Sequence, residues 1–262
     1  ELNGTITDCI PLNLQLRSAS QVLYSLKSFQ ADHPDDVYNV VKEIPWEDIL
    51  KKDAYFSVTS NVQHPSVNNS LFTNLRVKDA IVDRMRDKSG IRPATGSSSQ
   101  ALVIHLFWKE ENAEIFIDTA GESIAKHGYR KIPGQAPMLE ALASSTVMAT
   151  RWDRTSPFIN PMCGSGTIAI EAALIATNRY PGLFRNNYNF MHLAGYDEKI
   201  YTDCLEMIKA KIIPKPELEI IASDISGRAI ENAALNASAA GVRDLIRFEI
   251  CDFADTHLPE TE

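Results

Sequence analysis

The chain has 262 residues, of which 44% are hydrophobic, and its formal net charge is −8 at pH 7. This length and composition predict a globular protein of one large or two ordinary domains. They exclude a chain that is too polar to form a hydrophobic core. The negative charge argues against a surface that binds nucleic acid everywhere, and no apolar run reads as a membrane span.

Cysteine usage and the first residues give no sign of secretion. The four cysteines, Cys9, Cys163, Cys204 and Cys251, are far apart and form no C-x-x-C pair. They therefore predict neither a metal site nor a disulfide framework, and they favour a reducing, cytoplasmic setting. No basic-then-apolar leader opens the chain, so we expect no signal peptide.

The first half of the chain predicts extended segments and one long helix. Extended segments are expected near residues 55–62 and 101–107, with a helix over residues 76–92 between them. Residues 92–100 contain a proline, a glycine and three serines, a composition that predicts a loop.

The helix over residues 76–92 carries a local surplus of basic side chains. Val77, Ile81 and Met85 recur at helical spacing and should face the core, which would leave the basic side chains outside. These outward basic residues are Arg76, Lys78, Arg84, Arg86, Lys88 and Arg92. They predict a patch that contacts phosphates, and the alternative is an ordinary solvated helix with ion pairs between successive turns.

A glycine-containing turn in the second half is the most informative feature of the sequence. It follows the apolar residues 157–159 and precedes a helical run at residues 168–176, and a further helix is expected at 139–149. The turn consists of Asn160, Pro161, Met162, Cys163, Gly164, Ser165, Gly166 and Thr167. Its glycines allow close approach of the backbone to a ligand, and the helix start offers unpaired N–H groups, so the turn predicts a nucleotide-type pocket.

Acidic residues at two later strand ends narrow the choice of cofactor. After an insertion with a predicted helix at 198–213, a strand at 218–223 ends in Asp224. A helix at 226–240 then leads to a strand at 245–250, which is followed by Asp252. A dinucleotide fingerprint needs its acid about 20 residues after the glycines. Asp224 lies much further on, so the spacing disfavours a dinucleotide-dependent oxidoreductase.

The order of these motifs resembles the class I S-adenosylmethionine-dependent methyltransferases. The glycine turn, together with residues 170–173 and 181–183, is more closely similar to the bacterial 23S ribosomal RNA guanine-N2 methyltransferases that carry a THUMP RNA-binding domain. That family commonly has Asp where this chain has Asn160, so one charge beside the cofactor sulfonium is absent. Four upstream segments match the same family, at residues 74–83, 115–122, 128–130 and 136–140.

The resemblance implies an α/β protein with two domains. We expect a THUMP-like RNA-binding domain at residues 1–118 whose N-terminal part is missing, and a linker at 119–138. The remainder, residues 139–262, would be a Rossmann-like class I methyltransferase domain that is truncated after its third strand. The implied cofactor is S-adenosylmethionine, with no metal, and the implied partner is RNA, specifically 23S ribosomal RNA.

The resemblance also assigns roles within the site. Asp224 would accept hydrogen bonds from the ribose hydroxyls, Asp252 would accept from the adenine amino group, and Ile225 or Phe253 would cover the ring. Their alternatives are a helix cap for Asp224 and a solvated strand-end acid for Asp252. Cys163 is not expected to act as a nucleophile. Four aromatic residues should pack the insertion onto the sheet rather than stack on a flipped base: Tyr180, Phe184, Tyr188 and Phe190.

One motif of amino-group methyltransferases does not occur in the sequence. The Asn/Asp-Pro-Pro-Phe/Tyr segment that holds the target amine is missing, so no catalytic residue is assigned and the chain reads as an internal fragment that is inactive by itself. Its first methyltransferase strand should then have an unpaired edge. Two alternatives remain: an adenine-N6 methyltransferase acting on DNA or RNA, and an RNA-binding module with an inactive methyltransferase scaffold.

Overall fold

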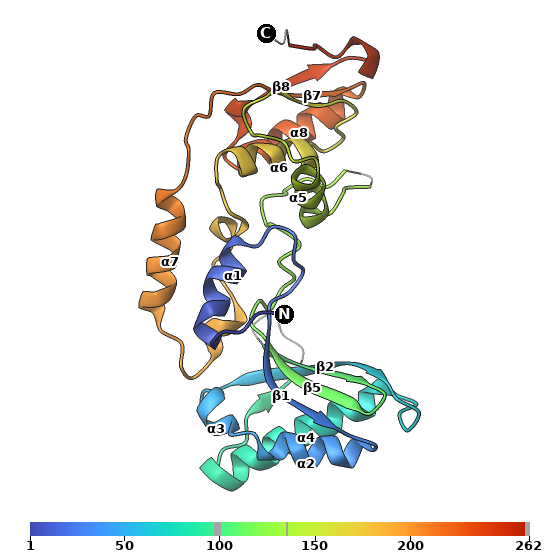
Figure 1. Cartoon of the computed structure of the whole chain (residues 1–262), viewed down its shortest axis with the longest axis vertical. Helices are drawn as coiled ribbons and strands as arrows, with labels where there is room; N and C mark the ends of the chain where they lie inside the picture. The colour runs from blue at the N-terminus through green and yellow to red at the C-terminus, as the bar shows by residue number, and fades with distance from the viewer. Residues whose placement is uncertain (97–100, 135, 260–262) are drawn as a thin grey trace. The chain divides into compact units, whose positions relative to one another are not determined.

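The computed structural model describes residues 1–96, 101–134 and 136–259, and it divides into two compact units (Figure 1). The first unit combines residues 1–13, 21–123 and 187–201, and the second combines 14–20, 124–186 and 202–262. Among the described residues, no helix is both long enough and apolar enough to cross a membrane.

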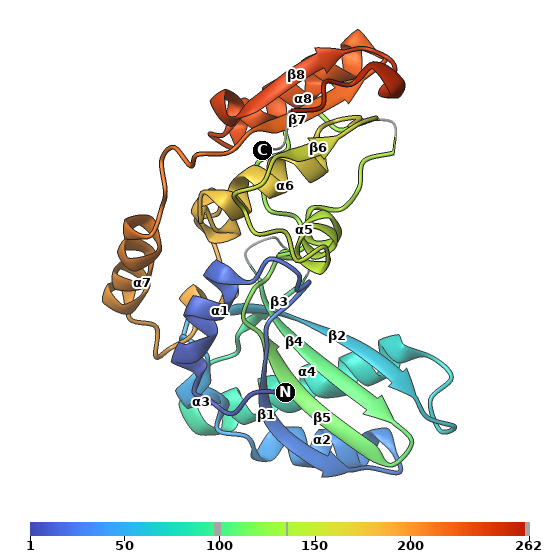
Figure 2. The ribbon, with the colours of Figure 1, turned by 45° about the horizontal axis from the view of Figure 1, so that its top comes forward.

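The first unit contains a five-stranded mixed sheet in the order β1-β5-β4-β2-β3. Its strands are β1 (Leu23–Gln30), β2 (Tyr55–Gln63), β3 (Ala94–Thr95), β4 (Leu102–Lys109) and β5 (Asn112–Asp118). Its helices are α2 (Pro34–Glu43), α3 (Trp46–Ile49) and α4 (Ser70–Ser89), and it also contains the first five residues of α1 (Cys9–Gln15). Strand β2 runs parallel to β3 and β4, whereas β5 is antiparallel to β1 and β4. Figure 2 shows α2 and α4 together behind the sheet.

Alternation of side chains along the strands explains why one face of this sheet is covered. On β4, Leu102, Ile104, Leu106 and Trp108 are buried, whereas the residues between them are more exposed. Helix α4 supplies the matching apolar stripe, since Val77, Ile81 and Met85 are all buried, as the helical spacing predicted.

Two sequence predictions for this unit need correction. The α4 helix begins at Ser70, where Asn69 accepts a hydrogen bond from the N–H of Leu71 (2.9 Å), and it ends before Gly90, whose φ of 70° stops the helix before Arg92. The loop predicted at 92–100 contains the short strand β3, which pairs with Tyr55 and Phe56. Residues 97–100 of that loop lie outside the described residues.

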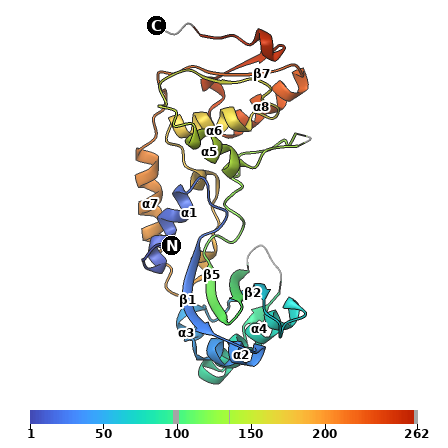
Figure 3. The same ribbon diagram turned by 45° about the vertical axis from the view of Figure 1, so that its right-hand side comes forward.

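The second unit contains the predicted Rossmann-like arrangement. Its parallel sheet has the order β6-β7-β8, with strands β6 (Phe158–Asn160), β7 (Ile220–Asp224) and β8 (Ile246–Ile250). Its helices are α5 (Glu140–Ala149), α6 (Thr167–Ala176) and α8 (Gly227–Ala239), while α7 (Glu198–Ala210) spans the boundary between the units. Figure 3 shows α8 beside β7. In the described chain β6 is paired only with β7, so its other edge has no strand partner, as predicted.

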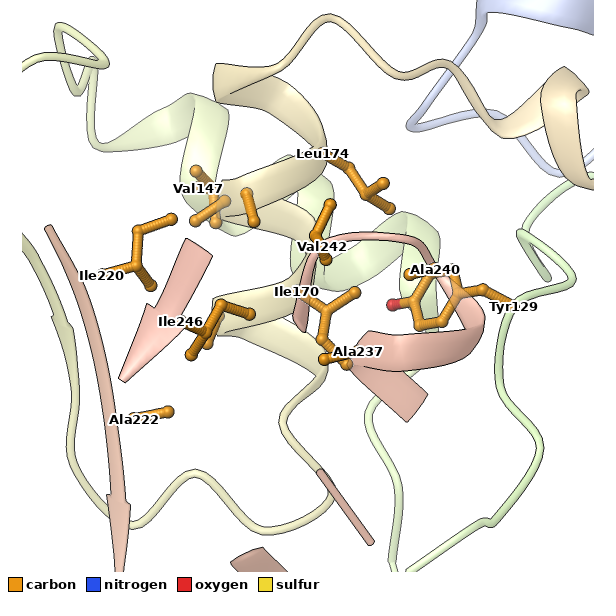
Figure 4. Close-up of a cluster of buried hydrophobic side chains, with 13 residues drawn as sticks. Tyr129, Val147, Ile170, Leu174, Ile220, Ala222, Ala237, Ala240, Val242 and Ile246 are labelled. Carbon is orange, nitrogen blue, oxygen red and sulfur yellow. The ribbon is translucent and has the colours of Figure 1, made fainter. Parts of the chain in front are cut away.

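An apolar cluster joins the helices of the second unit to its sheet (Figure 4). Val147 comes from α5, Ile170 and Leu174 from α6, and Ile220 and Ile246 from β7 and β8. Burial of apolar surface stabilises a fold by about 25 cal/mol per Å². The cluster therefore fixes α6, and with it the turn that leads into α6, against the sheet.

The boundary between the two units falls inside the linker predicted at residues 119–138. Residues 119–123 belong to the first unit, and the second unit begins again at Ile124. Tyr129 is 2% exposed and belongs to the apolar cluster, and His127 is completely buried. An aromatic side chain packed in this way holds its backbone in place, which the loop-like composition of the segment concealed.

Of the four aromatic residues expected to pack the insertion onto the methyltransferase sheet, only Tyr180 and Phe184 belong to the unit that contains that sheet. Tyr188 and Phe190 belong to the first unit, where their rings stack at 5.0 Å and the N–H of Phe190 donates to the carbonyl of Thr119 (3.1 Å). Both are almost fully buried, so neither is free to stack on a base. Phe184 contacts Tyr129 in the second unit at a ring distance of 6.0 Å, and Tyr180 lies under Arg17 at 4.9 Å.

Candidate functional site: a cofactor cradle in the second unit

The turn between β6 and α6 depends on positive backbone φ angles. Met162, Gly164 and Gly166 have φ values of 56°, 56° and 80°. A Cβ on Gly166 would lie 2.8 Å from the Cβ of Ala233, so only glycine fits there. The N–H of Cys163 donates to the carbonyl of Ser223 on β7 (2.8 Å), which anchors the start of the turn to the sheet.

Gly164 leaves open space on the outer side of the turn. No heavy atom lies within 4 Å of the position that its Cβ would take, whereas its N–H donates to Asp224 Oδ2 at 2.9 Å. Helix α6 then begins without a side-chain cap. An open approach beside uncapped N–H groups is the setting in which proteins bind polar or anionic groups of a cofactor.

The Asp224 carboxylate holds the turn and has capacity to bind a ligand as well. Its Oδ1 accepts from the N–H of Ser226 (2.9 Å), and the Ser226 side chain, rather than Asp224, caps α8 through Ala229. Each carboxylate oxygen offers two lone pairs, and only one protein donor is shown at each. The half-buried carboxylate can therefore still accept two hydroxyl donors, and the predicted ribose role stays a prediction.

The ends of the three parallel strands bring the other predicted residues to the same edge of the sheet. Asn160 ends β6, Asp224 ends β7, and Asp252 follows β8, where its carboxylate accepts from the N–H of Ala254 (3.0 Å). Ile225 and Phe253 are 74% and 60% exposed, which is unusual for such large apolar side chains. Exposed apolar groups beside polar acceptors suit a flat heterocycle with donor groups at its rim.

Asn160 carries an unsatisfied acceptor next to the turn. Its Oδ1 is buried and has no hydrogen-bond partner in the described structure, while its Nδ2 donates to the carbonyl of Pro161 at 3.4 Å. A buried polar atom without a partner costs about 1–3 kcal/mol. A ligand donor would remove that cost, so the amide fits the cofactor site even though it lacks the charge of an aspartate.

The Cys163 thiol is in an environment that disfavours the reactive thiolate. Burial and the neighbouring Asp224 carboxylate raise the pKa of Cys163 to about 12. The thiol therefore stays protonated at neutral pH, and the thiolate is the nucleophilic form, so covalent chemistry at Cys163 is still not expected. In the part of the chain that the structure describes, no cluster of three His, Cys, Asp or Glu residues could hold a metal ion.

Two of the predicted RNA-binding residues, Arg76 and Arg84, form ion pairs with neighbouring helices. Arg84 donates to both oxygens of Glu47 (3.0 and 2.6 Å), which bridges α4 to α3. Arg76 is paired with Asp35 on α2 and lies 4.4 Å from the ring of Tyr38. These side chains are 20% and 28% exposed, so they are less accessible than the helical pattern predicted, and their role as RNA contacts stays a prediction. Pairing with carboxylates on neighbouring helices explains the difference.

The remaining basic residues of α4 are more accessible. Arg86 is 60% exposed and lies 2.9 Å from Asp83, and Lys78 lies 3.4 Å from Asp79. Lys88 lies in the last turn of the helix, and no ion pair is shown for it among the described residues. Any phosphate contact by α4 would therefore depend on Lys78, Arg86 and Lys88, whose role as an RNA site stays a prediction.

Sequence reasoning missed Arg130 and Asn236, which support the turn from outside it. Arg130 donates to Thr167 Oγ1 (3.0 Å) at the start of α6. Asn236 is 1% exposed on the face of α8 that also carries the buried Ala233 and Ala237. A polar residue on an otherwise apolar helix face was the signal available in the sequence, since buried polar groups are nearly always hydrogen-bonded.

Comparison with known families matches both units. The model of an RMKL-like methyltransferase domain matches residues 127–262, and the model of the THUMP domain matches residues 31–118.

Solved structures are similar to most of this chain. A predicted N6-adenine-specific DNA methylase from Listeria monocytogenes is 33% identical, with a TM-score of 0.89 over 97% of this chain and 67% of its own. SMU.472, described as a methyltransferase and solved in complex with SAH, is 28% identical, with a TM-score of 0.88 over 98% of this chain and 68% of its own. TrmN from Thermus thermophilus, 18% identical with a TM-score of 0.61, shares the fold over 90% of this chain and 58% of its own. The chain thus spans about two thirds of the first two relatives.

Proposed function

The chain belongs to the family of RMKL-like methyltransferases, here with a THUMP domain, and from this membership we propose that it is the cofactor-binding part of an RNA methyltransferase that uses S-adenosylmethionine. The observation that carries the proposal is the joint position of the glycine turn and Asp224, linked by the 2.9 Å hydrogen bond from Gly164 to the carboxylate. A relative 28% identical over 98% of this chain was solved with SAH, the demethylated form of that cofactor.

We use the name cradle for the glycine turn at residues 160–167 together with Asp224, Ile225, Asp252 and Phe253. These residues fit the parts of this cofactor. Asp224 would bind the ribose hydroxyls, Asp252 would accept from the adenine amino group, and Ile225 or Phe253 would cover the ring. The turn from Asn160 to Thr167 would bind the amino-acid portion. When bound, S-adenosylmethionine supplies a methyl group on a sulfonium that needs no further activation. The protein must chiefly align the acceptor and exclude water from it.

RNA is the proposed substrate because a THUMP domain occupies residues 31–118. We propose guanine N2 of 23S ribosomal RNA as the target, on the motif resemblance of the glycine turn and its flanks. The alternative target is adenine N6, the specificity named for the Listeria monocytogenes relative. Nucleoside analysis of RNA methylated by a longer family member that includes these residues decides between them: N2-methylguanosine supports the proposal and N6-methyladenosine contradicts it.

Removing the Asp224 carboxylate is expected to weaken cofactor binding. Asp224→Ala leaves the ribose hydroxyls and the Gly164 N–H without an acceptor, so the binding free energy for S-adenosylhomocysteine should fall by roughly 1–3 kcal/mol. Isothermal titration calorimetry measures the change. Asp244→Ala, an exposed acid that precedes β8 and therefore lies at the opposite end of that strand, serves as the control and should bind as the parent does. Equal affinities for the two variants would remove Asp224 from the site.

Removing the accessible basic residues of α4 is expected to weaken RNA binding. The double variant Lys78→Ala/Lys88→Ala should lower the salt dependence of RNA affinity by about one unit of slope for each phosphate that the helix no longer binds. Filter binding over a series of salt concentrations measures the slope. Lys209→Ala, which removes an exposed lysine from α7, is the matched control. A double variant with the slope of the control would show that this face of α4 is only a solvated surface.

A further inference from the structure

We propose that Asn236 is a positioning residue of the cofactor site, which sets the geometry of the glycine turn through a fully occupied side-chain amide. The inference rests on the proposed function, because it concerns the same cradle. Asn236 lies on α8 and is not among the residues that the sequence motifs assign to the cofactor.

The Asn236 amide uses its whole hydrogen-bonding capacity. Its Oδ1 accepts from the N–H groups of Lys131 (2.9 Å) and Ile132 (3.0 Å). Its Nδ2 donates to the carbonyl of Ile132 (2.9 Å) and to the carbonyl of Ser165 (3.3 Å). A carboxamide has two donor hydrogens and one acceptor oxygen with two lone pairs. Every position is filled, and asparagine alone offers this combination at this side-chain length.

On one side, these bonds hold the middle of the glycine turn. Ser165 is 9% exposed, and it lies between the two glycines of positive φ. Ala233, one helical turn before Asn236, meets the position of a Gly166 Cβ at 2.8 Å. The same face of α8 therefore limits the turn by contact at Gly166 and by a hydrogen bond at Ser165.

On the other side, the amide holds the segment that precedes α5. Lys131 and Ile132 directly follow Arg130, which donates to Thr167 Oγ1 at the start of α6 (3.0 Å). The segment is thus joined to the turn twice, through Arg130 and through Asn236. These hydrogen bonds, to Ser165 and Thr167 on either side of Gly166, restrict the directions in which the N–H groups of the turn can point. Such pre-organisation lowers the entropic cost of ordering the turn when a ligand binds.

The test replaces Asn236 by the isosteric aspartate. A carboxylate keeps the acceptor for Lys131 and Ile132 but loses both donors, and it places charge against the carbonyls of Ile132 and Ser165. We expect Asn236→Asp to bind S-adenosylhomocysteine on the order of 10- to 100-fold more weakly than the parent at neutral pH, as two buried hydrogen bonds are lost. Lowering the pH should narrow this ratio, because a protonated carboxyl regains one donor.

The control is Ser238→Asp, which adds the same charge to an exposed position of the same helix and should bind as the parent does. Asn236→Ala serves as a second variant without the repulsive charge and should also bind more weakly. An affinity within about threefold of the parent in a folded Asn236 variant would overturn the proposal. Failure of both variants to fold would also overturn it, because Asn236 would then be a residue needed for packing of the whole unit. Absence of binding by the parent chain itself would instead refute the proposed function.

Discussion

Replacing Glu171 with Ala is expected to destabilise the second unit by about 3–5 kcal/mol, because the change breaks a fully buried Glu171–His127 pair by removing one partner. Glu171 lies on α6 and is completely buried, as is His127. The Nδ1 atom of His127 lies 2.8 Å from Glu171 Oε1, and Nε2 lies 3.0 Å from the carbonyl oxygen of Arg17. Both ring nitrogens therefore have an oxygen partner inside the fold, and removal of the Glu171 side chain leaves Nδ1 buried without one.

The second oxygen of Glu171 increases the effect. Ser144 on α5 donates its hydroxyl to Glu171 Oε2 (2.5 Å), so the carboxylate joins α5, α6 and the segment that contains His127. Glu171→Ala therefore also leaves a buried hydroxyl unpaired, whereas Glu171→Gln keeps an acceptor and should cost less. Urea denaturation followed by circular dichroism measures the free energies. A loss of stability no larger than that of Glu231→Ala, an exposed glutamate on α8, would contradict this account.

The 262-residue chain is expected to transfer methyl groups at a rate several orders of magnitude below that of a longer relative. The cofactor cradle is present, but the sequence contains no Asn/Asp-Pro-Pro-Phe/Tyr segment to accept hydrogen bonds from the target amine. Loss of a single group that stabilises a transition state typically costs about 10²–10³ in rate, and misalignment of the reactant adds to this.

Incubation with ribosomal RNA and labelled S-adenosylmethionine measures this rate. The control is a longer family member that contains the acceptor segment. Both proteins are assayed at the same fractional saturation with cofactor, so that a difference in cofactor affinity does not alter the comparison of transfer rates. Incorporation of label into RNA at a comparable rate would show that the groups that hold the acceptor lie within these 262 residues.

Local patterns in the sequence were sufficient to predict the glycine turn and the strand ends beside it, whereas the binding role of these residues stays a prediction. The two glycines adopt positive φ, which glycine tolerates best, and Asp224 and Asp252 follow strands whose apolar runs are easily read. Because parallel strands end at the same edge of a sheet, their order along the chain placed these residues together. The family resemblance supplied the role of each residue, which the pattern alone left open.

Interactions between distant parts of the chain were not predictable in this way. Arg84 is paired with Glu47, and Asn236 binds Lys131 and Ile132, although each partner is far away in the sequence. A charge or an amide has the same local pattern whether it faces water or a buried acceptor. For the same reason nothing in the sequence indicated that residues 187–201 pack with the first unit.

Calorimetry on the parent chain distinguishes a cradle that binds S-adenosylmethionine from one that binds a dinucleotide. The chain is titrated in parallel with S-adenosylhomocysteine and with NAD at the same ionic strength. We predict saturable binding of S-adenosylhomocysteine at one site, with little or no heat from NAD. Preferential binding of NAD, or no binding of S-adenosylhomocysteine by the folded chain, would show that the cradle is not an S-adenosylmethionine site.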